Sequence, residues 1–206
     1  MRRLTQHTLD PAAARIQLNE LVKIMSSKNV LKEQKDVLPF FRNRPDICLM
    51  FSYYLPEIKE PDWLGIEFQI YGDFRADLIV GDFNARRYML IEFEDGSPNS
   101  IFSKRPKNVP AWASRMEGAF SQIVDWYYKL DDMKSTADFT NTFGDRDAVF
   151  EGLIVTGKDM KLEPQQTSRL KWRVENVRVA SKKINTISFD EFVSDADFRL
   201  KRYHGV

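Results

Sequence analysis

Four β-rich segments follow one another between residues 47 and 93, and this pattern constrains the fold more than any other feature of the sequence. The segments cover residues 47–54, 65–71, 74–80 and 87–93. The turns at 71–73 and 81–84 contain Gly72 and Gly81, and short glycine-containing turns commonly join neighbouring antiparallel strands. The region therefore predicts an antiparallel meander.

Helical patterns lie on both sides of the predicted meander. A first helix is expected at 10–25, which begins with the helix-start pair Asp10-Pro11. A second helix is expected at about 27–41, and Arg44-Pro45 ends it, because the residue before proline disfavours the helical conformation. Farther along, we expect a helix at 112–131, a buried strand at 148–157, an amphipathic helix at 163–178, a strand at 184–187 and a helical turn at 190–192. This order predicts an α/β (α+β) fold with a central mixed β-sheet flanked by helices.

The composition is that of an ordinary globular chain of one domain, or two small ones, with 206 residues of which 43% are hydrophobic. No segment has the apolar length of a signal peptide core or a membrane span, so we expect no membrane association. The single cysteine, Cys48, excludes an intrachain disulfide and fits a reducing, cytoplasmic location. His7 and His204 lie near opposite ends, so any chemistry is expected to rest on carboxylates.

Basic and acidic residues nearly cancel, with 31 Lys and Arg against 30 Asp and Glu. Because a domain that coats phosphates usually has a clear basic excess, the net charge of +1 does not by itself indicate nucleic-acid binding. The charge is nevertheless separated along the chain. Residues 61–100 contain three arginines and eight acidic residues, a balance of −5, which leaves +6 for the rest.

Three carboxylates are expected to converge on the predicted sheet. Asp77 lies inside the apolar strand at 74–80, and Glu92 and Glu94 share a face at the end of the strand that begins at Arg87. Buried acidic residues are usually paired or bind a cation, and Mg²⁺ held by one or two carboxylates is a common solution. The alternative is that these are solvated edge residues or partners in ion pairs.

Gln122 adds a polar side chain to the predicted helix at 112–131. It lies four residues before Trp126, so both project from one helical face. Its amide would find a partner in the carboxylate cluster. The alternative is a glutamine at the polar border of the helix.

Taken in order, these motifs resemble the PD-(D/E)xK nuclease superfamily and, within it, the Shedu-type antiphage proteins with a DUF4263 domain. The similarity extends over about residues 29–192. The matching pieces are a first helix with Glu33, the strand ADLI at 76–79, the strand MLIEFE at 89–94, the helix motif QIVDWY at 122–127 and the strand FEGLIVTG at 150–157. One departure is Glu94, which stands where the superfamily usually has a lysine.

The resemblance implies a restriction-endonuclease-like core over residues 27–206, preceded by an N-terminal helical extension at 1–26. It implies that Asp77 and Glu92 bind Mg²⁺ or Mn²⁺, with the Phe93 carbonyl as a candidate third ligand. Glu94 and Gln122 would complete the catalytic set, and Glu33 would support it. The implied nucleic-acid-binding residues are Lys104, Arg105, Lys107, Arg169, Lys171 and Arg173, each of which can also be read as a solvated surface charge.

The resemblance implies a metal-dependent DNA endonuclease of antiphage defence, whose substrate is DNA, including phage DNA, and which forms a homo-oligomer. In the superfamily the lysine positions the attacking water and stabilises negative charge, so Glu94 leaves a second interpretation open. In that interpretation the chain keeps the fold and serves as a catalytically silent nucleic-acid-binding or regulatory module. A cation from the loop, namely Lys104, Arg105 or Lys107, is expected to replace the lysine if the chain is active.

Overall fold

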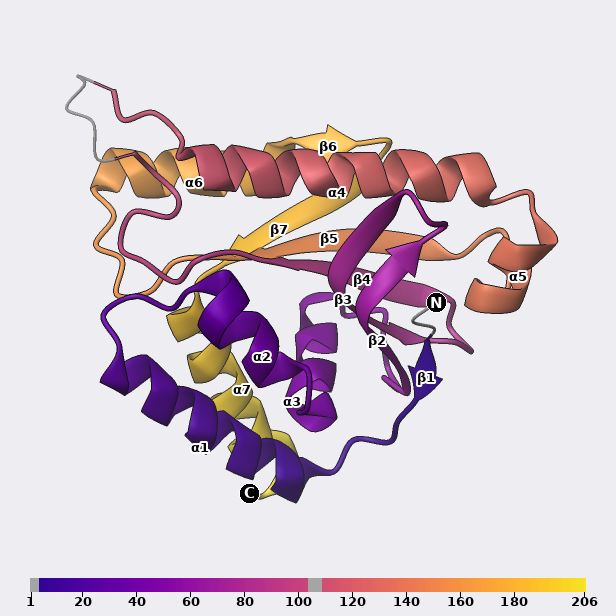
Figure 1. Ribbon diagram of the computed structural model, residues 1–206, viewed down its shortest axis with the longest axis horizontal. Helices are drawn as coiled ribbons and strands as arrows, with labels where there is room; N and C mark the ends of the chain where they lie inside the picture. Colours follow the sequence, from indigo (N-terminus) through magenta and orange to yellow (C-terminus); the bar gives the residue numbers. More distant parts are fainter. Residues whose placement is uncertain (1–3, 104–108) are drawn as a thin grey trace.

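The computed structural model describes residues 4–103 and 109–206, and in this part of the chain the centre of the fold is a seven-stranded mixed β-sheet (Figure 1). The strands are β1 (Thr5–Gln6), β2 (Trp63–Ile70), β3 (Phe74–Asp82), β4 (Arg87–Phe93), β5 (Val149–Val155), β6 (Arg178–Val179) and β7 (Lys182–Ile187). Their order across the sheet is β1-β2-β3-β4-β5-β7-β6. Neighbours from β1 to β4 are antiparallel, β4, β5 and β7 run parallel, and β6 is antiparallel to β7. The predicted mixed sheet, with an antiparallel meander at β2, β3 and β4, is confirmed.

Helices cover both faces of the sheet. The α-helices are α1 (Pro11–Ser27), α2 (Leu38–Phe41), α3 (Pro45–Leu49), α4 (Ser114–Met133), α5 (Ala137–Phe143), α6 (Pro164–Asn176) and α7 (Phe189–His204). A π-helical turn, η1 (Glu33–Val37), precedes α2, and a 3-10 helix, η2 (Met50–Tyr54), follows α3. Figure 1 shows α1, α2, α3 and α7 on one face and α4 and α6 on the other. None of the helices in residues 4–103 and 109–206 is long and apolar enough to cross a membrane.

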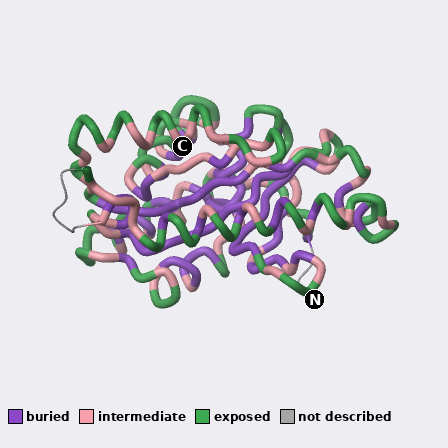
Figure 2. Tube along the Cα trace, turned by 90° about the horizontal axis from the view of Figure 1, so that it is seen from above, coloured by how far each residue is buried: buried purple, intermediate pink, exposed green. Residues whose placement is uncertain are grey.

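Alternation along the strands divides the apolar side chains between two cores. On β4, Met89 and Ile91 pack beneath α1, α3 and α7, whereas Tyr88 and Leu90 pack beneath α4. Figure 2 shows the strands as a buried interior between helices whose outer surfaces are exposed. Because Glu92 has the same parity as Leu90, its side chain is directed to the α4 face.

Residues 47–54 form helix, which corrects the strand predicted there. Pro45 stands in the first turn of α3, where its fixed φ angle suits a helix start, and η2 continues the coil to Tyr54. Residues 47–51 are all at least 99% buried. A short run of continuous apolar residues does not distinguish a buried strand from a buried helix, and here the helix start decided.

Two further helix boundaries differ from the predictions. The second helix was predicted from about residue 27, but it begins at Glu33, because Leu31 pairs in a β-bridge with Gly96 instead. The helical turn predicted at 190–192 is the start of the 16-residue helix α7, which a capping box between Ser188 and Glu191 initiates. At the N-terminus, α1 packs against α3 and α7, and the division of the chain after residue 26 stays a prediction.

Candidate active site

Asp77 and Glu92 lie opposite each other on the central strands β3 and β4. The paired register ends with Leu78 opposite Ile91, so the next position along both strands places Asp77 opposite Glu92. Leu78 and Ile91 pack into the core beneath α1 and α7. Since side chains alternate along β4, Glu92 is directed to the opposite face, where Gln122 of α4 contacts it. Asp77 is joined to β4 by a hydrogen bond from the Phe93 amide. The strand register thus brings together the two carboxylates that the sequence singles out.

Both carboxylates are nearly buried, with 7% of Asp77 and 5% of Glu92 exposed. Asp77 Oδ2 accepts a hydrogen bond of 2.9 Å from the Phe93 amide. Burial raises the pKa of Asp77 to about 7 against the lowering effect of that hydrogen bond. Burial, followed by the charges of Asp77 and Glu94, raises the pKa of Glu92 to about 10. The pair therefore resists carrying two negative charges unless a cation accompanies it.

Gln122 connects α4 to this pair. Its Nε2 donates a hydrogen bond of 2.7 Å to Glu92 Oε1. The predicted contact between Gln122 and the carboxylate cluster is therefore present. Gln122 itself is exposed, so the two carboxylates lie directly beneath the protein surface.

Glu94 continues the same face of the extended chain two residues beyond Glu92. Its backbone amide bonds to the Val155 carbonyl, which keeps the chain extended past the end of β4. Only 6% of Glu94 is exposed, and its Oε2 accepts a hydrogen bond of 2.8 Å from Arg115 Nη1. Burial raises the pKa of Glu94, although Arg115 opposes this. The guanidinium thus neutralises a carboxylate that burial would otherwise disfavour as an anion.

A second group of charges gathers beside Glu94. Asp95 accepts hydrogen bonds of 2.9 Å from Lys32 Nζ and from the Glu33 amide. Burial alone would raise the pKa of Asp95, but these donors lower it below its ordinary value. Glu33 Oε2 lies 3.6 Å from Arg115 Nη1. The start of η1 therefore brings Glu33 to the edge of the carboxylate cluster, and its supporting role stays a prediction.

Arg115, Asp95 and Lys32 are members of this cluster that the sequence interpretation missed. A signal for Arg115 was available, because it precedes Gln122 by seven residues. Two helical turns separate them, so both side chains project from one face of α4. The two residues reach Glu94 and Glu92 respectively.

The donor set suits a hard divalent cation that keeps part of its water shell. Within residues 4–103 and 109–206, no three or more His, Cys, Asp and Glu side chains form a ready-made metal-binding group. Asp77 and Glu92 each use one carboxylate oxygen in the hydrogen bonds described above, and each carboxylate has a second oxygen. Two carboxylates, a main-chain carbonyl and waters are an ordinary ligand set for Mg²⁺.

Three of the six candidate nucleic-acid-binding residues, Arg169, Lys171 and Arg173, lie in the described part of the chain. Lys104, Arg105 and Lys107 fall outside the described residues. Lys171 is on the exposed side of α6, with 71% of its side chain exposed and Glu175 Oε1 3.9 Å from its Nζ. Arg169 and Arg173 turn instead toward α4 and the chain segment that precedes it.

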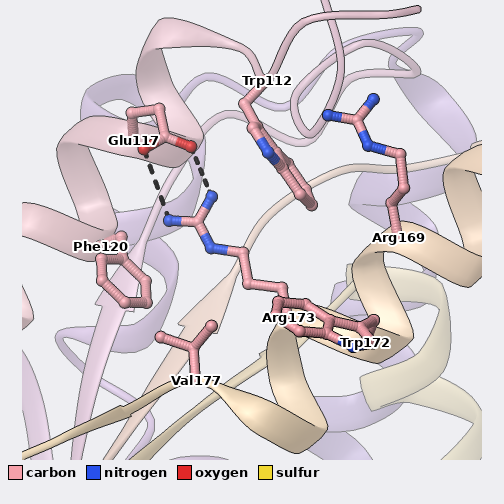
Figure 3. Close-up of a pocket in the computed structure, with 7 residues that line it drawn as sticks. All are labelled: Trp112, Glu117, Phe120, Arg169, Trp172, Arg173 and Val177. Atoms are coloured by element: carbon pink, nitrogen blue, oxygen red, sulfur yellow. Dashed lines mark hydrogen bonds and ion pairs between the residues drawn. The ribbon is translucent and has the colours of Figure 1, made fainter.

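A groove between α4 and α6 contains these two arginines (Figure 3). Its volume is about 550 Å³, and its lining residues are Trp112, Glu117, Phe120, Arg169, Trp172, Arg173 and Val177. Arg173 forms an ion pair with Glu117, and its guanidinium lies 4.7 Å from the Trp112 ring centroid and 4.3 Å from that of Phe120. Arg169 donates to the Pro110 carbonyl. Both arginines therefore fasten α6 to its neighbours.

Comparison with known proteins identifies one family. The family model described as Shedu protein SduA, C-terminal, matches residues 31–193. The match spans Glu33, Asp77, Glu92, Glu94, Arg115 and Gln122. Among curated proteins, the comparison finds no match.

Proposed function

The chain belongs to the family of the C-terminal region of the Shedu protein SduA, and on this premise we propose that it is a Mg²⁺-dependent DNA endonuclease of antiphage defence. One observation carries the proposal. Two nearly buried carboxylates, Asp77 and Glu92, lie opposite each other on neighbouring central strands directly beneath the surface. This is the arrangement that the resemblance to PD-(D/E)xK nucleases implies for its metal ligands.

Asp77 and Glu92 are the proposed ligands, with the Phe93 carbonyl as the third. When bound by these residues, Mg²⁺ or Mn²⁺ would supply positive charge next to the scissile phosphate and would orient a water for attack. The Phe93 amide fixes the Asp77 carboxylate through Oδ2, and Gln122 fixes Glu92 through Oε1. Such supporting hydrogen bonds orient ligands and raise affinity for the cation. Glu33 closes the same edge of the site from η1.

The substrate strand is proposed to pass between the carboxylate pair and the basic residues of the 104–107 loop and α6. The described ends of that loop lie against α6, since Arg169 contacts the Pro110 carbonyl and its guanidinium lies 5.3 Å from the Phe102 ring centroid. Lys104, Arg105, Lys107 and Lys171 are the residues proposed to contact phosphates, and Arg169 and Arg173 hold α6 in place. Phosphate contacts of this kind position a nucleic acid without reading its sequence.

A second candidate function is a catalytically silent binding or regulatory module. The ion pair between Glu94 and Arg115 favours it, because a neutralised carboxylate stands where the superfamily has a lysine. This module would bind DNA without hydrolysing it. It would also keep its biological activity in the Asp77→Ala, Glu92→Ala double variant.

A cleavage assay separates the two functions. Purified wild-type protein is incubated with linear, circular and single-stranded DNA in Mg²⁺ or Mn²⁺, beside the variants Asp77→Asn and Asp82→Asn. Asp82 is a matched control, because it is a buried carboxylate on the same strand that accepts hydrogen bonds from the backbone amides of Lys59, Glu60 and Ala85. Cleavage by wild type and Asp82→Asn, with none by Asp77→Asn, supports the nuclease. Equal cleavage by Asp77→Asn, or no cleavage by wild type with every substrate, contradicts it.

A further inference from the structure

Arg115 occupies a special position among the cationic side chains at the carboxylate cluster. It belongs to the first turn of α4, and its Nη1 lies 2.8 Å from Glu94 Oε2 and 3.6 Å from Glu33 Oε2. Its Nη2 lies 3.6 Å from Asp95 Oδ2. Three acidic side chains from two parts of the chain thus surround one guanidinium.

The guanidinium keeps donors available after these contacts. Arginine has five N–H groups in a planar fork, and only the contact with Glu94 is a hydrogen bond. About half of the side chain, 49%, is exposed. Arg115 can therefore bind an oxyanion that approaches from solvent and keep its hydrogen bond to Glu94 at the same time. Lysine, with one nitrogen, cannot offer a fork of this kind.

Lys32 is a second cation beside Arg115, but it contacts a different carboxylate. Its Nζ lies 2.9 Å from Asp95 Oδ2, and 57% of its side chain is exposed. Arg115 is instead bonded to Glu94, which follows Glu92 on the same face of the extended chain. Arg115 is thus held at Glu94, two residues beyond the proposed ligand Glu92. Arg75 on β3 also acts on Asp77, where it opposes the rise in pKa that burial causes, but it forms an ion pair with Glu67 rather than with Glu94.

Hydrolysis of a phosphodiester creates a need for such a cation. The water oxygen forms a bond to phosphorus, the bond from phosphorus to one ester oxygen breaks, and one water proton ends on the leaving oxygen. Negative charge grows on the oxygens around phosphorus as the reaction proceeds. A fixed donor aimed at those oxygens stabilises the transition state more than the ground state.

We propose that Arg115 is a catalytic residue that contacts a non-bridging oxygen of the scissile phosphate, and that Glu94 is the positioning residue that holds its guanidinium. The inference rests on the proposed nuclease function. The proposal explains why a carboxylate stands at position 94, since Glu94 orients the Arg115 guanidinium. It also locates the cation on α4, whereas the sequence interpretation expected it on the loop at 104–107.

The test compares Arg115→Met and Arg115→Lys with Arg86→Met in the full chain. Arg86 is the matched control, because 47% of its side chain is exposed, it forms one ion pair, with Asp145, and it lies at the β3–β4 turn. For Arg115→Met we expect kcat to fall about 100-fold or more, as when one transition-state donor is removed, with a smaller change in KM. Arg115→Lys keeps the charge but not the fork, so its kcat is expected between those of wild type and Arg115→Met.

A second measurement uses no catalysis. Binding of a short DNA duplex is measured in EDTA as a function of salt concentration. Loss of one phosphate contact is expected to reduce the slope of log K against log salt by about 1 for Arg115→Met. The slope for Arg86→Met is expected to equal that of wild type. A purely structural role for Arg115 would lower the thermal stability and leave this slope unchanged.

The outcomes separate this inference from the function on which it rests. Wild-type rates in Arg115→Met and Arg115→Lys, alongside an inactive Asp77→Asn, would overturn the role of Arg115 and leave the nuclease in place. An unchanged salt slope in Arg115→Met would also overturn it. Failure of wild type to cleave any DNA would overturn both. If Arg115→Met does not fold, the decision falls to Arg115→Lys, whose kcat must then lie below that of wild type. Its salt slope is expected to equal that of wild type, because lysine keeps the charge.

Discussion

Gln122 Nε2 on α4 lies 2.7 Å from Glu92 Oε1 on β4, so a helix side chain fixes the orientation of a nearly buried strand carboxylate. In the variant Gln122→Ala the carboxylate loses this donor, and we expect the affinity for Mn²⁺ to fall about 10- to 100-fold, as is typical when a residue that orients a metal ligand is removed. Titration calorimetry measures the change. Ser121→Ala, an exposed neighbour on the same helix, is the control. Equal affinity in Gln122→Ala and wild type would refute an orienting role.

Asp77→Asn is expected to stabilise the metal-free protein at neutral and alkaline pH. Burial raises the pKa of Asp77 to about 7 and of Glu92 to about 10, whereas the unfolded chain loses the same protons near pH 4. Between these values the unfolded state binds fewer protons, so the free energy of unfolding decreases as pH rises. The contribution of these groups is fully present below about pH 4 and is lost as pH rises through the folded-state pKa values.

Urea unfolding in EDTA from pH 5 to pH 9 measures this effect. Wild type is expected to lose more stability over the range than Asp77→Asn does. Saturating Mn²⁺ is expected to restore stability to wild type at pH 8 but not to Asp77→Asn, because a ligand stabilises only the state that binds it. If the free energy of unfolding depends on pH in the same way for the two proteins in EDTA, the raised pKa of the buried carboxylate pair is contradicted.

Asp46 is expected to act in the opposite direction. Its carboxylate accepts hydrogen bonds from His7 Nε2 at 2.8 Å, from the Asp10 amide at 2.9 Å and from Gln17 Nε2 at 3.0 Å. Burial alone would raise the pKa of Asp46, but these donors lower it below its ordinary value. Its stabilising contribution is therefore present above about pH 4 and is lost as pH falls through the lowered pKa.

The variant Asp46→Asn tests these hydrogen bonds between the N-terminal segment and α3. At pH 7 we expect a loss of roughly 1–3 kcal/mol in the free energy of unfolding, because buried donors lose a charged acceptor. The loss is expected to shrink below about pH 4, because the unfolded chain takes up a proton there and the folded carboxylate follows as pH falls through its lowered pKa. Urea unfolding at pH 7 and pH 3 provides the comparison. A loss that is as large at pH 3 as at pH 7 would disagree with this explanation.

Gly152 on β5 permits α4 to pack closely against the sheet. A Cβ at this position would lie 2.6 Å from Ile123 Cγ2 and 3.0 Å from the Tyr127 hydroxyl oxygen. Gly152→Ala is therefore expected to destabilise the fold by about 1–3 kcal/mol, as overpacking does. Gly118→Ala is the control, because a Cβ there meets nothing within 4 Å and helix interiors favour alanine over glycine by roughly 0.5–1 kcal/mol. Thermal unfolding should show a lower melting temperature for Gly152→Ala and an equal or higher one for Gly118→Ala. An unchanged melting temperature in Gly152→Ala would show that α4 and the sheet can move apart to accommodate the methyl group.

The sequence predicted the sheet better than it predicted the surrounding helices. Alternating side chains and turn glycines located β3 and β4 well, and the pairing of these strands brings Asp77 opposite Glu92. Residues 47–54 were misassigned, because a continuous apolar run has no periodicity that separates strand from helix. The short prediction for α7 overlooked the capping box that begins at Ser188. Helix α7 also packs against α1, and this contact could not be read from the sequence.

The candidate site was predictable as a set of strand carboxylates but not as a charge network. Burial next to apolar neighbours identified Asp77 and Glu92, and the helix motif identified Gln122. The contact between Arg115 and Glu94 depends on where the first turn of α4 passes the end of β4. The separation of Arg115 and Glu94 is set by the packing of α4 on the sheet. The spacing of residues along the chain does not determine this packing.

Anomalous diffraction from crystals soaked in Mn²⁺ tests the central claim most directly. We predict one anomalous peak between the carboxylates of Asp77 and Glu92, within coordination distance of both. The same soak of Asp77→Asn crystals should give no peak there. Absence of a peak between the two carboxylates at saturating Mn²⁺ in wild-type crystals would contradict the proposed metal site and the nuclease mechanism built on it.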